Sequence, residues 1–99
     1  GFNPQGDGNV IRINIPALSG EVRQKMVSRI KELAEETRVS IRNVRRDGNK
    51  AADQAEKDKN LNEDLRDDLK NEIQDLTKKY ETSVNDAAQN REAEVMESS

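Results

Sequence analysis

Mostly apolar residues recur at steps of three and four over two long segments of the chain. No proline interrupts residues 17–99. This spacing places the recurring positions on one face of a helix. It predicts two long helices, at about residues 20–59 and 63–97, packed along a near-heptad seam. The seam positions are Met26, Ile30, Leu33, Thr37, Ile41, Val44, Gly48, Ala51 and Ala55, then Leu65, Leu69, Ile73, Leu76, Tyr80, Val84 and Ala87.

The two expected helices have clear start signals. Ser19 can cap the first helix, and Glu21 suits its positive end. Asn62, in "KNLNED", can cap the second. The short connection between the helices predicts an antiparallel hairpin, so the fold class is all-α. Since each helix of a hairpin buries only one stripe, we expect a third helix, from missing chain or from a second copy, to complete the core.

Residues 1–18 have a different character. They hold both prolines and three of the five glycines. The stretch "PQGDGN" is typical of a turn. Val10 to Ile15 then alternate between apolar and polar, which predicts a short half-buried strand. Pro16 ends that strand because proline donates no ladder hydrogen bond.

Composition limits the possible functions. The chain is 37% charged and 31% hydrophobic, with no Trp, Cys or His. Disorder is the competing interpretation of such a composition, and the apolar periodicity argues against it. Thiol and imidazole catalysis and the usual zinc sites are excluded, and we expect no enzyme activity. The acidic residues of "EDLRDDLKNE" predict a solvated helix face rather than a calcium site. The chain lacks an initiator Met, which indicates a part of a longer protein, and has no apolar stretch long enough to span a membrane.

The chain gathers positive charge in one place, "RVSIRNVRRDGNK" at residues 38–50, although its net charge is −3. Residues 19–50 carry nine Lys or Arg and five Asp or Glu, a net +4, whereas residues 51–99 carry seven and fourteen, a net −7. At 100° per residue, the basic side chains share a helix face beside the seam. The candidate polyanion-binding residues on this face are Arg38, Arg42, Arg45, Arg46 and Asn49.

Two interpretations of this face remain open on the pattern alone. Acidic residues of the second helix could neutralise the arginines, leaving an ordinary solvated face. Alternatively, the guanidinium forks could bind phosphate oxygens. Because no aromatic residue lies near the face, phosphate-backbone recognition is favoured over base readout.

Several stretches together resemble the C-terminal half of a ribosome recycling factor. They are "IRINIPALSGEVRQKMV", "VSIRNVRRDGNK", "EIQDLTKKY" and "REAEVM", with Gly1-Phe2-Asn3-Pro4 resembling a G-x-x-P phrase of the family; "RNVRRD" at residues 42–47 is the most specific. The resemblance implies a three-helix bundle joined to a small α/β domain. Residues 1–18 would be the tail of the small domain and a linker. Residues 19–99 would be two bundle helices, with the first helix missing.

The resemblance also implies a function and partners. The family binds the ribosome after termination, and its bundle lies on large-subunit RNA. Elongation factor G, using GTP, then helps to separate the subunits, and the recycling factor needs no cofactor or metal. Arg42, Arg45 and Arg46 match the RNA-contacting motif, and Arg38 and Asn49 are added because they share the face. Gly48 stands where the family usually has Ala.

Further expectations follow from this resemblance. The factor would act in the bacterial cytoplasm, or alternatively in a mitochondrion or plastid. Contact with elongation factor G would run through the mostly missing small domain, and the chain is expected to self-associate to complete its bundle. The alternative function is a structural or regulatory coiled-coil protein that pairs with another helix.

Overall fold

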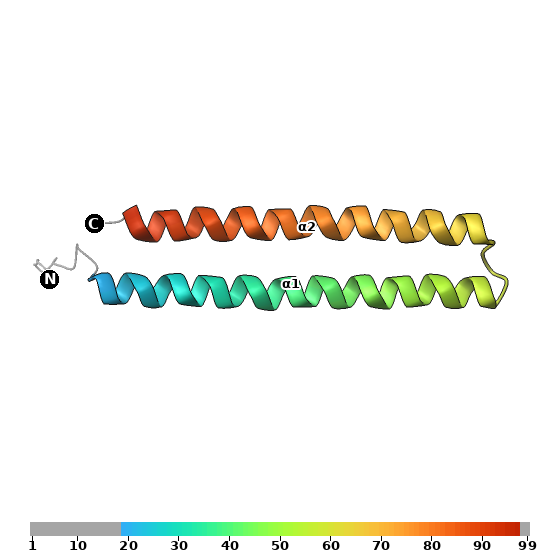
Figure 1. Ribbon diagram of the computed structural model, residues 1–99, viewed down its shortest axis with the longest axis horizontal. Helices are drawn as coiled ribbons and strands as arrows, with labels where there is room; N and C mark the ends of the chain where they lie inside the picture. The colour runs from blue at the N-terminus through green and yellow to red at the C-terminus, as the bar shows by residue number, and fades with distance from the viewer. Residues whose placement is uncertain (1–18, 98–99) are drawn as a thin grey trace, which may run out of the picture.

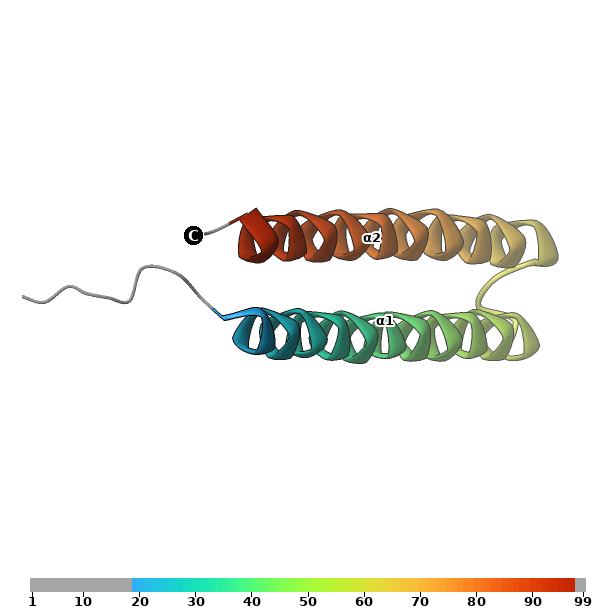
Figure 2. The ribbon, with the colours of Figure 1, turned by 60° about the vertical axis from the view of Figure 1, so that its left-hand side comes forward.

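The computed structural model describes residues 19–97, which form a hairpin of two long antiparallel helices (Figure 1). Helix α1 spans Gly20–Lys57 and helix α2 spans Glu63–Glu97. The helices stay side by side in the turned view (Figure 2). The predicted all-α hairpin is therefore confirmed, whereas the strand predicted before Pro16 lies outside the described residues. Neither helix is long and apolar enough to cross a membrane.

Both helices begin at the predicted caps. The Val22 N–H donates to Ser19 Oγ at 3.1 Å, and the Leu65 N–H donates to Asn62 Oδ1 at 2.8 Å. Each bond satisfies one N–H group that has no acceptor inside its helix. Acidic residues follow in the first turn of both helices, where the helix dipole favours negative charge.

Helix α1 ends at Lys57, two residues before the predicted end. The chain reverses through Lys59, whose φ of 62° is in the left-handed region. The Lys59 N–H donates to the Glu56 carbonyl at 3.0 Å, and the Asn60 N–H donates to the Ala55 carbonyl at 2.9 Å. This pair of bonds is a Schellman motif, which normally places glycine where Lys59 stands.

Small residues lie at the contact between the helices. Ala34 and Ala52 of α1 and Thr77 and Val95 of α2 are buried. Ala34 and Ala52 are eighteen residues apart, or five helical turns, so they lie on the same side of α1. The Thr77 hydroxyl donates to the Ile73 carbonyl within α2 at 2.8 Å, so its burial leaves no unpaired donor. The core of the described hairpin is thus a narrow line of small side chains.

The predicted seam is partly wrong, because its larger residues do not lie at this line. Leu33, Val44, Leu76 and Tyr80 are exposed. They lie about 60–100° around their helices from the buried residues, towards one side of the hairpin. We call this side the apolar edge, and its large exposed residues are Met26, Leu33, Val44, Leu65, Leu69, Leu76 and Tyr80.

The opposite side of the contact is polar. Lys70 Nζ lies 3.0 Å from Asp53 Oδ1, and Arg66 Nη1 lies 3.4 Å from Glu56 Oε1. These ion pairs lie between residues of the two helices that face each other. We call this side the charged edge; it consists of Arg38, Arg42, Asp53 and Glu56 of α1 and Arg66, Lys70, Glu81 and Asn85 of α2.

At the end of the hairpin opposite the loop, a side chain of α1 caps the C-terminus of α2. Arg23 Nη1 donates to the Met96 carbonyl at 2.6 Å and to the Val95 carbonyl at 3.2 Å. Carbonyls in the last turn of a helix lack intrahelical donors and carry partial negative charge. Arg23 of the first turn of α1 therefore stabilises the end of α2.

Candidate nucleic-acid interface

The basic stretch forms the part of α1 that runs towards the loop. Arg38, Arg42, Arg45 and Asn49 follow one another at steps of four, three and four, so a single helix face carries them. All four are half-buried, whereas Arg46 is exposed. The structure therefore brings four of the five predicted residues together on one face of α1, next to the charged edge, and leaves Arg46 more exposed.

Arg38 is held by protein acceptors on both helices. Its Nε donates to Glu35 Oε1 at 3.1 Å, and its Nη2 lies 3.1 Å from the same oxygen. Its Nη1 donates to Asn85 Oδ1 of α2 at 2.7 Å. All three guanidinium nitrogens are thus engaged, and only 25% of the side chain is exposed. Arg38 therefore links the two helices and has a structural role.

Arg42 is held more loosely. Its Nη1 lies 3.6 Å from Glu35 Oε2, and its Nε lies 3.5 Å from Glu81 Oε2 of α2. These are ion-pair distances beyond the usual range of a hydrogen bond. The side chain is 40% exposed. Arg42 is therefore attracted to two carboxylates while part of its guanidinium group faces solvent.

Arg45 and Arg46 have no acidic partner among the described residues. Arg46 Nη2 donates to Asn43 Oδ1 one turn earlier on the same helix. Asn49 Oδ1 is buried, and no donor reaches it within residues 19–97. Neutralisation by the second helix, the first of the two interpretations, thus applies to Arg42 through Glu81 and not to Arg45 or Arg46.

Three residues that organise this face were not predicted from the sequence: Glu35, Glu81 and Asn85. The spacing of Glu35 three residues before Arg38 is typical of a helical ion pair and could have been noticed. The role of Glu81 and Asn85 depends on the register between the helices, which no single-helix pattern contains.

Neighbouring charges on the edge are also paired. The hydrogen bond from Arg66 Nε to Asp67 Oδ1, 3.0 Å long, is the main cause that raises the pKa of Arg66 above its ordinary value. The acidic residues predicted to be solvated, among them Asp68 and Glu72, are exposed. Within residues 19–97 no group of three or more acidic side chains is arranged to hold a metal ion.

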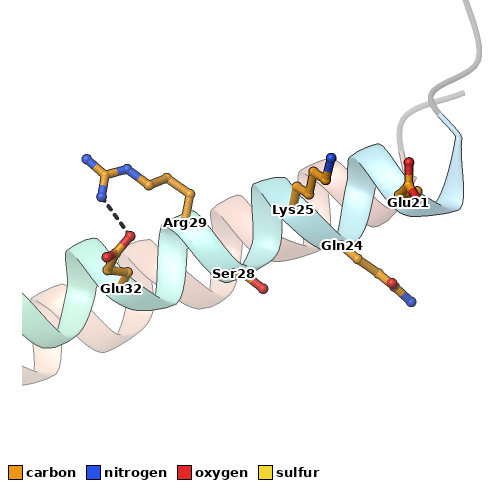
Figure 3. Close-up of a pocket in the computed structure, with 6 residues that line it drawn as sticks. All are labelled: Glu21, Gln24, Lys25, Ser28, Arg29 and Glu32. Atoms are coloured by element: carbon orange, nitrogen blue, oxygen red, sulfur yellow. Dashed lines mark hydrogen bonds and ion pairs between the residues drawn. The ribbon is translucent and has the colours of Figure 1, made fainter.

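The hollows elsewhere on the hairpin are less suited to a ligand. Figure 3 shows one that is lined entirely by side chains of the first turns of α1, which spread outwards from a single helix and include the Arg29–Glu32 ion pair of 2.7 Å. A second hollow lies between the helices on the apolar edge. It is lined by Ile30, Leu33, Ala34, Thr37, Val84, Ala87, Ala88 and Arg91. Its apolar lining suits another helix and not a polyanion.

Comparison with known proteins places the chain in a family. The model of the family described as "Ribosome recycling factor" matches residues 1–96. The ribosome-recycling factor of Rhodopirellula baltica is 79% identical over 52 residues, which cover 52% of this chain and 28% of that protein. The ribosome-recycling factors of Bacillus cytotoxicus and Bacillus thuringiensis are each 45% identical over 97 residues, or 98% of this chain and 52% of theirs. No solved structure matches the chain.

The chain thus spans about half the length of the Bacillus relatives. Since the family model covers nearly all of the 99 residues, including both helices and the basic stretch, the chain belongs to the ribosome recycling factor family.

Proposed function

We propose that this chain contributes to ribosome recycling after translation termination by binding the large ribosomal subunit. The observation that carries the proposal is the pair Arg45 and Arg46 on a helix of a ribosome recycling factor family member, with no acidic partner among residues 19–97. Uncompensated guanidinium groups repel each other and attract a polyanion. Ribosomal RNA is the polyanion that the family's name implies.

The proposed RNA contacts are made to phosphates. Arginine holds two phosphate oxygens with parallel N–H groups, which gives orientation as well as affinity. The single tyrosine, Tyr80, lies on the apolar edge and not beside the arginines. Without an aromatic side chain for base stacking, the face would recognise the RNA backbone and its shape. Arg42, Arg45 and Arg46 would make these contacts, with Asn49 at the end of the row.

The apolar edge fits the same proposal. Residues 19–99 would be two helices of the family's three-helix bundle, and the missing first helix would cover this edge. Residues 1–18 would belong to the small domain. Separation of the subunits by elongation factor G and GTP would need more of the small domain than this chain holds, so the chain alone should bind subunits without splitting ribosomes. The chain itself would catalyse no reaction, and its place of action would be the cytoplasm of a bacterium.

A second candidate function rests on the apolar edge alone. A structural or regulatory coiled-coil protein would expose such an edge to a partner helix. Its association would require the helices and would be insensitive to polyanions, whereas RNA binding depends on the release of counterions.

Binding to purified large subunits at two salt concentrations tests the proposal. We expect the chain to sediment with the subunits at low salt and its affinity to fall about tenfold or more when salt is raised fourfold, as for two or more phosphate contacts. An unrelated helical protein of similar net charge, added in excess, serves as the control for nonspecific trapping of protein in the pellet of subunits. Failure to sediment with large subunits at low salt would exclude the proposed function and leave the coiled-coil alternative.

A further inference from the structure

We propose that Glu81 of α2 is a positioning residue for Arg42, and that this carboxylate strengthens RNA binding although its charge repels RNA. The inference rests on the proposed function and deepens it. It assigns a role to a residue that would not touch the RNA. The carboxylate lies on the other helix from the arginine it serves, so the two helices would have to be docked for Arg42 to be held.

The geometry behind the proposal is a polar network that crosses the two helices. Asn85 accepts a hydrogen bond from Arg38, and Arg38 bonds Glu35. Glu35 lies 3.6 Å from Arg42, and Arg42 lies 3.5 Å from Glu81. Glu81 and Asn85 are one turn apart on α2, so the two ends of the network lie close together. Arg38, Glu35 and Arg42 each contact two other members of the network.

The network leaves Arg42 able to bind an anion. Its ion pairs run through Nε and Nη1, and Nη2 donates no hydrogen bond among the described residues. The carboxylates of Glu35 and Glu81 lie at Nη1 and Nε, on different edges of the guanidinium group. With 40% of the side chain exposed, the remaining N–H groups can reach a phosphate from solvent.

Positioning matters because an arginine side chain has many rotamers. Ordering such a side chain on binding has an entropic cost that lowers affinity. A side chain that is already held in its binding orientation loses less freedom when the phosphate arrives. Glu81 is suited to this holding role because only 25% of its own side chain is exposed, so its own position is restricted by α2 and its surroundings.

Charge alone predicts the opposite effect, which makes the proposal testable. Removing any carboxylate raises the net charge of the chain and should strengthen binding to RNA. Removing the carboxylate of Glu81 should instead weaken binding if its main effect is to hold Arg42. Because the pair is an ion pair at 3.5 Å, an amide of the same shape does not replace the attraction.

The experiment compares Glu81→Gln with Asp86→Asn in the full 99-residue chain, by measuring affinity for purified large subunits. Asp86 is exposed on α2 and has no ion pair among the described residues, so its amide variant makes the same charge change without altering the network. We expect Glu81→Gln to bind about threefold more weakly than the unaltered chain, and Asp86→Asn to bind equally or more tightly. A Glu81→Gln variant that binds as tightly as Asp86→Asn overturns the proposal.

Arg42→Ala completes the test. If Glu81 acts through Arg42, Glu81→Gln should no longer weaken binding in an Arg42→Ala chain. The same loss with and without Arg42 would instead indicate a general structural effect and would overturn the proposal.

Helicity and thermal midpoint are measured for every variant, and affinities are compared well below the lowest midpoint. Unchanged affinity for Arg42→Ala itself would remove Arg42 from the RNA contacts, and positioning by Glu81 with it, whereas failure of the unaltered chain to bind would remove the proposed function.

Discussion

Gly48 of α1 and Ile73 of α2 approach so closely that a Cβ atom on Gly48 would lie 3.0 Å from Ile73 Cδ1. Glycine in a helix interior costs about 1 kcal/mol relative to alanine. The close contact is with the end of a flexible side chain that is only half-buried, so the methyl group can shift. We therefore expect Gly48→Ala to stabilise the hairpin by up to about 1 kcal/mol, measured by urea unfolding.

Ile73→Val gives the matched control, because it removes the Cδ1 methyl that the new Cβ would approach. The gain from Gly48→Ala should be larger in the Ile73→Val chain than in the unaltered one. Destabilisation by Gly48→Ala in both backgrounds would show that the helices cannot separate enough for a β-carbon, and that Gly48 is required for their approach.

The arginines of the basic face should separate into two groups. Replacing Arg42, Arg45 and Arg46 with Ala should weaken binding to large subunits and lower the salt dependence by about one unit of slope per lost phosphate contact. Helicity should be unchanged, because Arg45 and Arg46 make no ion pair to α2, and the partly exposed ion pair of Arg42 with Glu81 at 3.5 Å contributes little to stability. Affinity equal to that of the unaltered chain at matched salt would contradict the assignment.

Arg38→Ala should have a different effect. It leaves Glu35 and Asn85 without their shared donor, so the hairpin should lose about 1 kcal/mol of unfolding free energy. Measuring urea unfolding and subunit binding on the same samples separates the groups. A loss of stability from Arg45→Ala equal to that from Arg38→Ala would contradict the distinction.

Sequence periodicity predicted the helices well and their contact poorly, for a physical reason. Polar caps at Ser19 and Asn62 are local signals, and both were found where expected. Apolar spacing identifies the positions that are buried in a complete helical bundle. It does not show which helix buries each of them. The helices meet at Ala34 and Ala52 because small side chains permit close approach. Larger residues such as Leu33 flank that line.

The basic face shows the same limit. Helical angles placed Arg38, Arg42 and Arg45 on one face of α1, since that depends on α1 alone, whereas Arg46 is more exposed than these three. Which of them are neutralised depends on the register of α2. Glu81 meets Arg42 and no carboxylate of α2 meets Arg45, as far as residues 19–97 are concerned. The end of α1 was missed because Lys59, and not glycine, adopts the left-handed conformation that stops it.

Lys59→Gly should stabilise the turn between the helices. A non-glycine residue in the left-handed region is strained, and glycine is not, although glycine also gains freedom in the unfolded chain. We expect a net increase of roughly 0.5 kcal/mol in unfolding free energy. Lys59→Ala is the control for the loss of the charge and should give no increase. An equal gain from both variants would assign the effect to charge and not to the backbone.

The apolar edge predicts that the 99-residue chain associates with a second copy of itself. Val44, Leu76 and Tyr80 are more than half exposed there, on both helices of a hairpin whose shortest dimension is 15 Å. Pairing two such edges about a twofold axis would bury these residues in a four-helix arrangement. Sedimentation equilibrium should therefore show a dimer or larger species at micromolar concentration.

Leu76→Glu should shift this equilibrium towards the monomer, because the new carboxylate would be buried without a partner in the dimer. Val39→Glu is the matched control: Val39 is also an exposed apolar residue of α1, but it lies on another side of that helix. Association should survive Val39→Glu and not Leu76→Glu. A well-folded monomer of the unaltered chain at all concentrations would mean that the two helices are stable with their edge in water, which the small area of their contact makes physically costly.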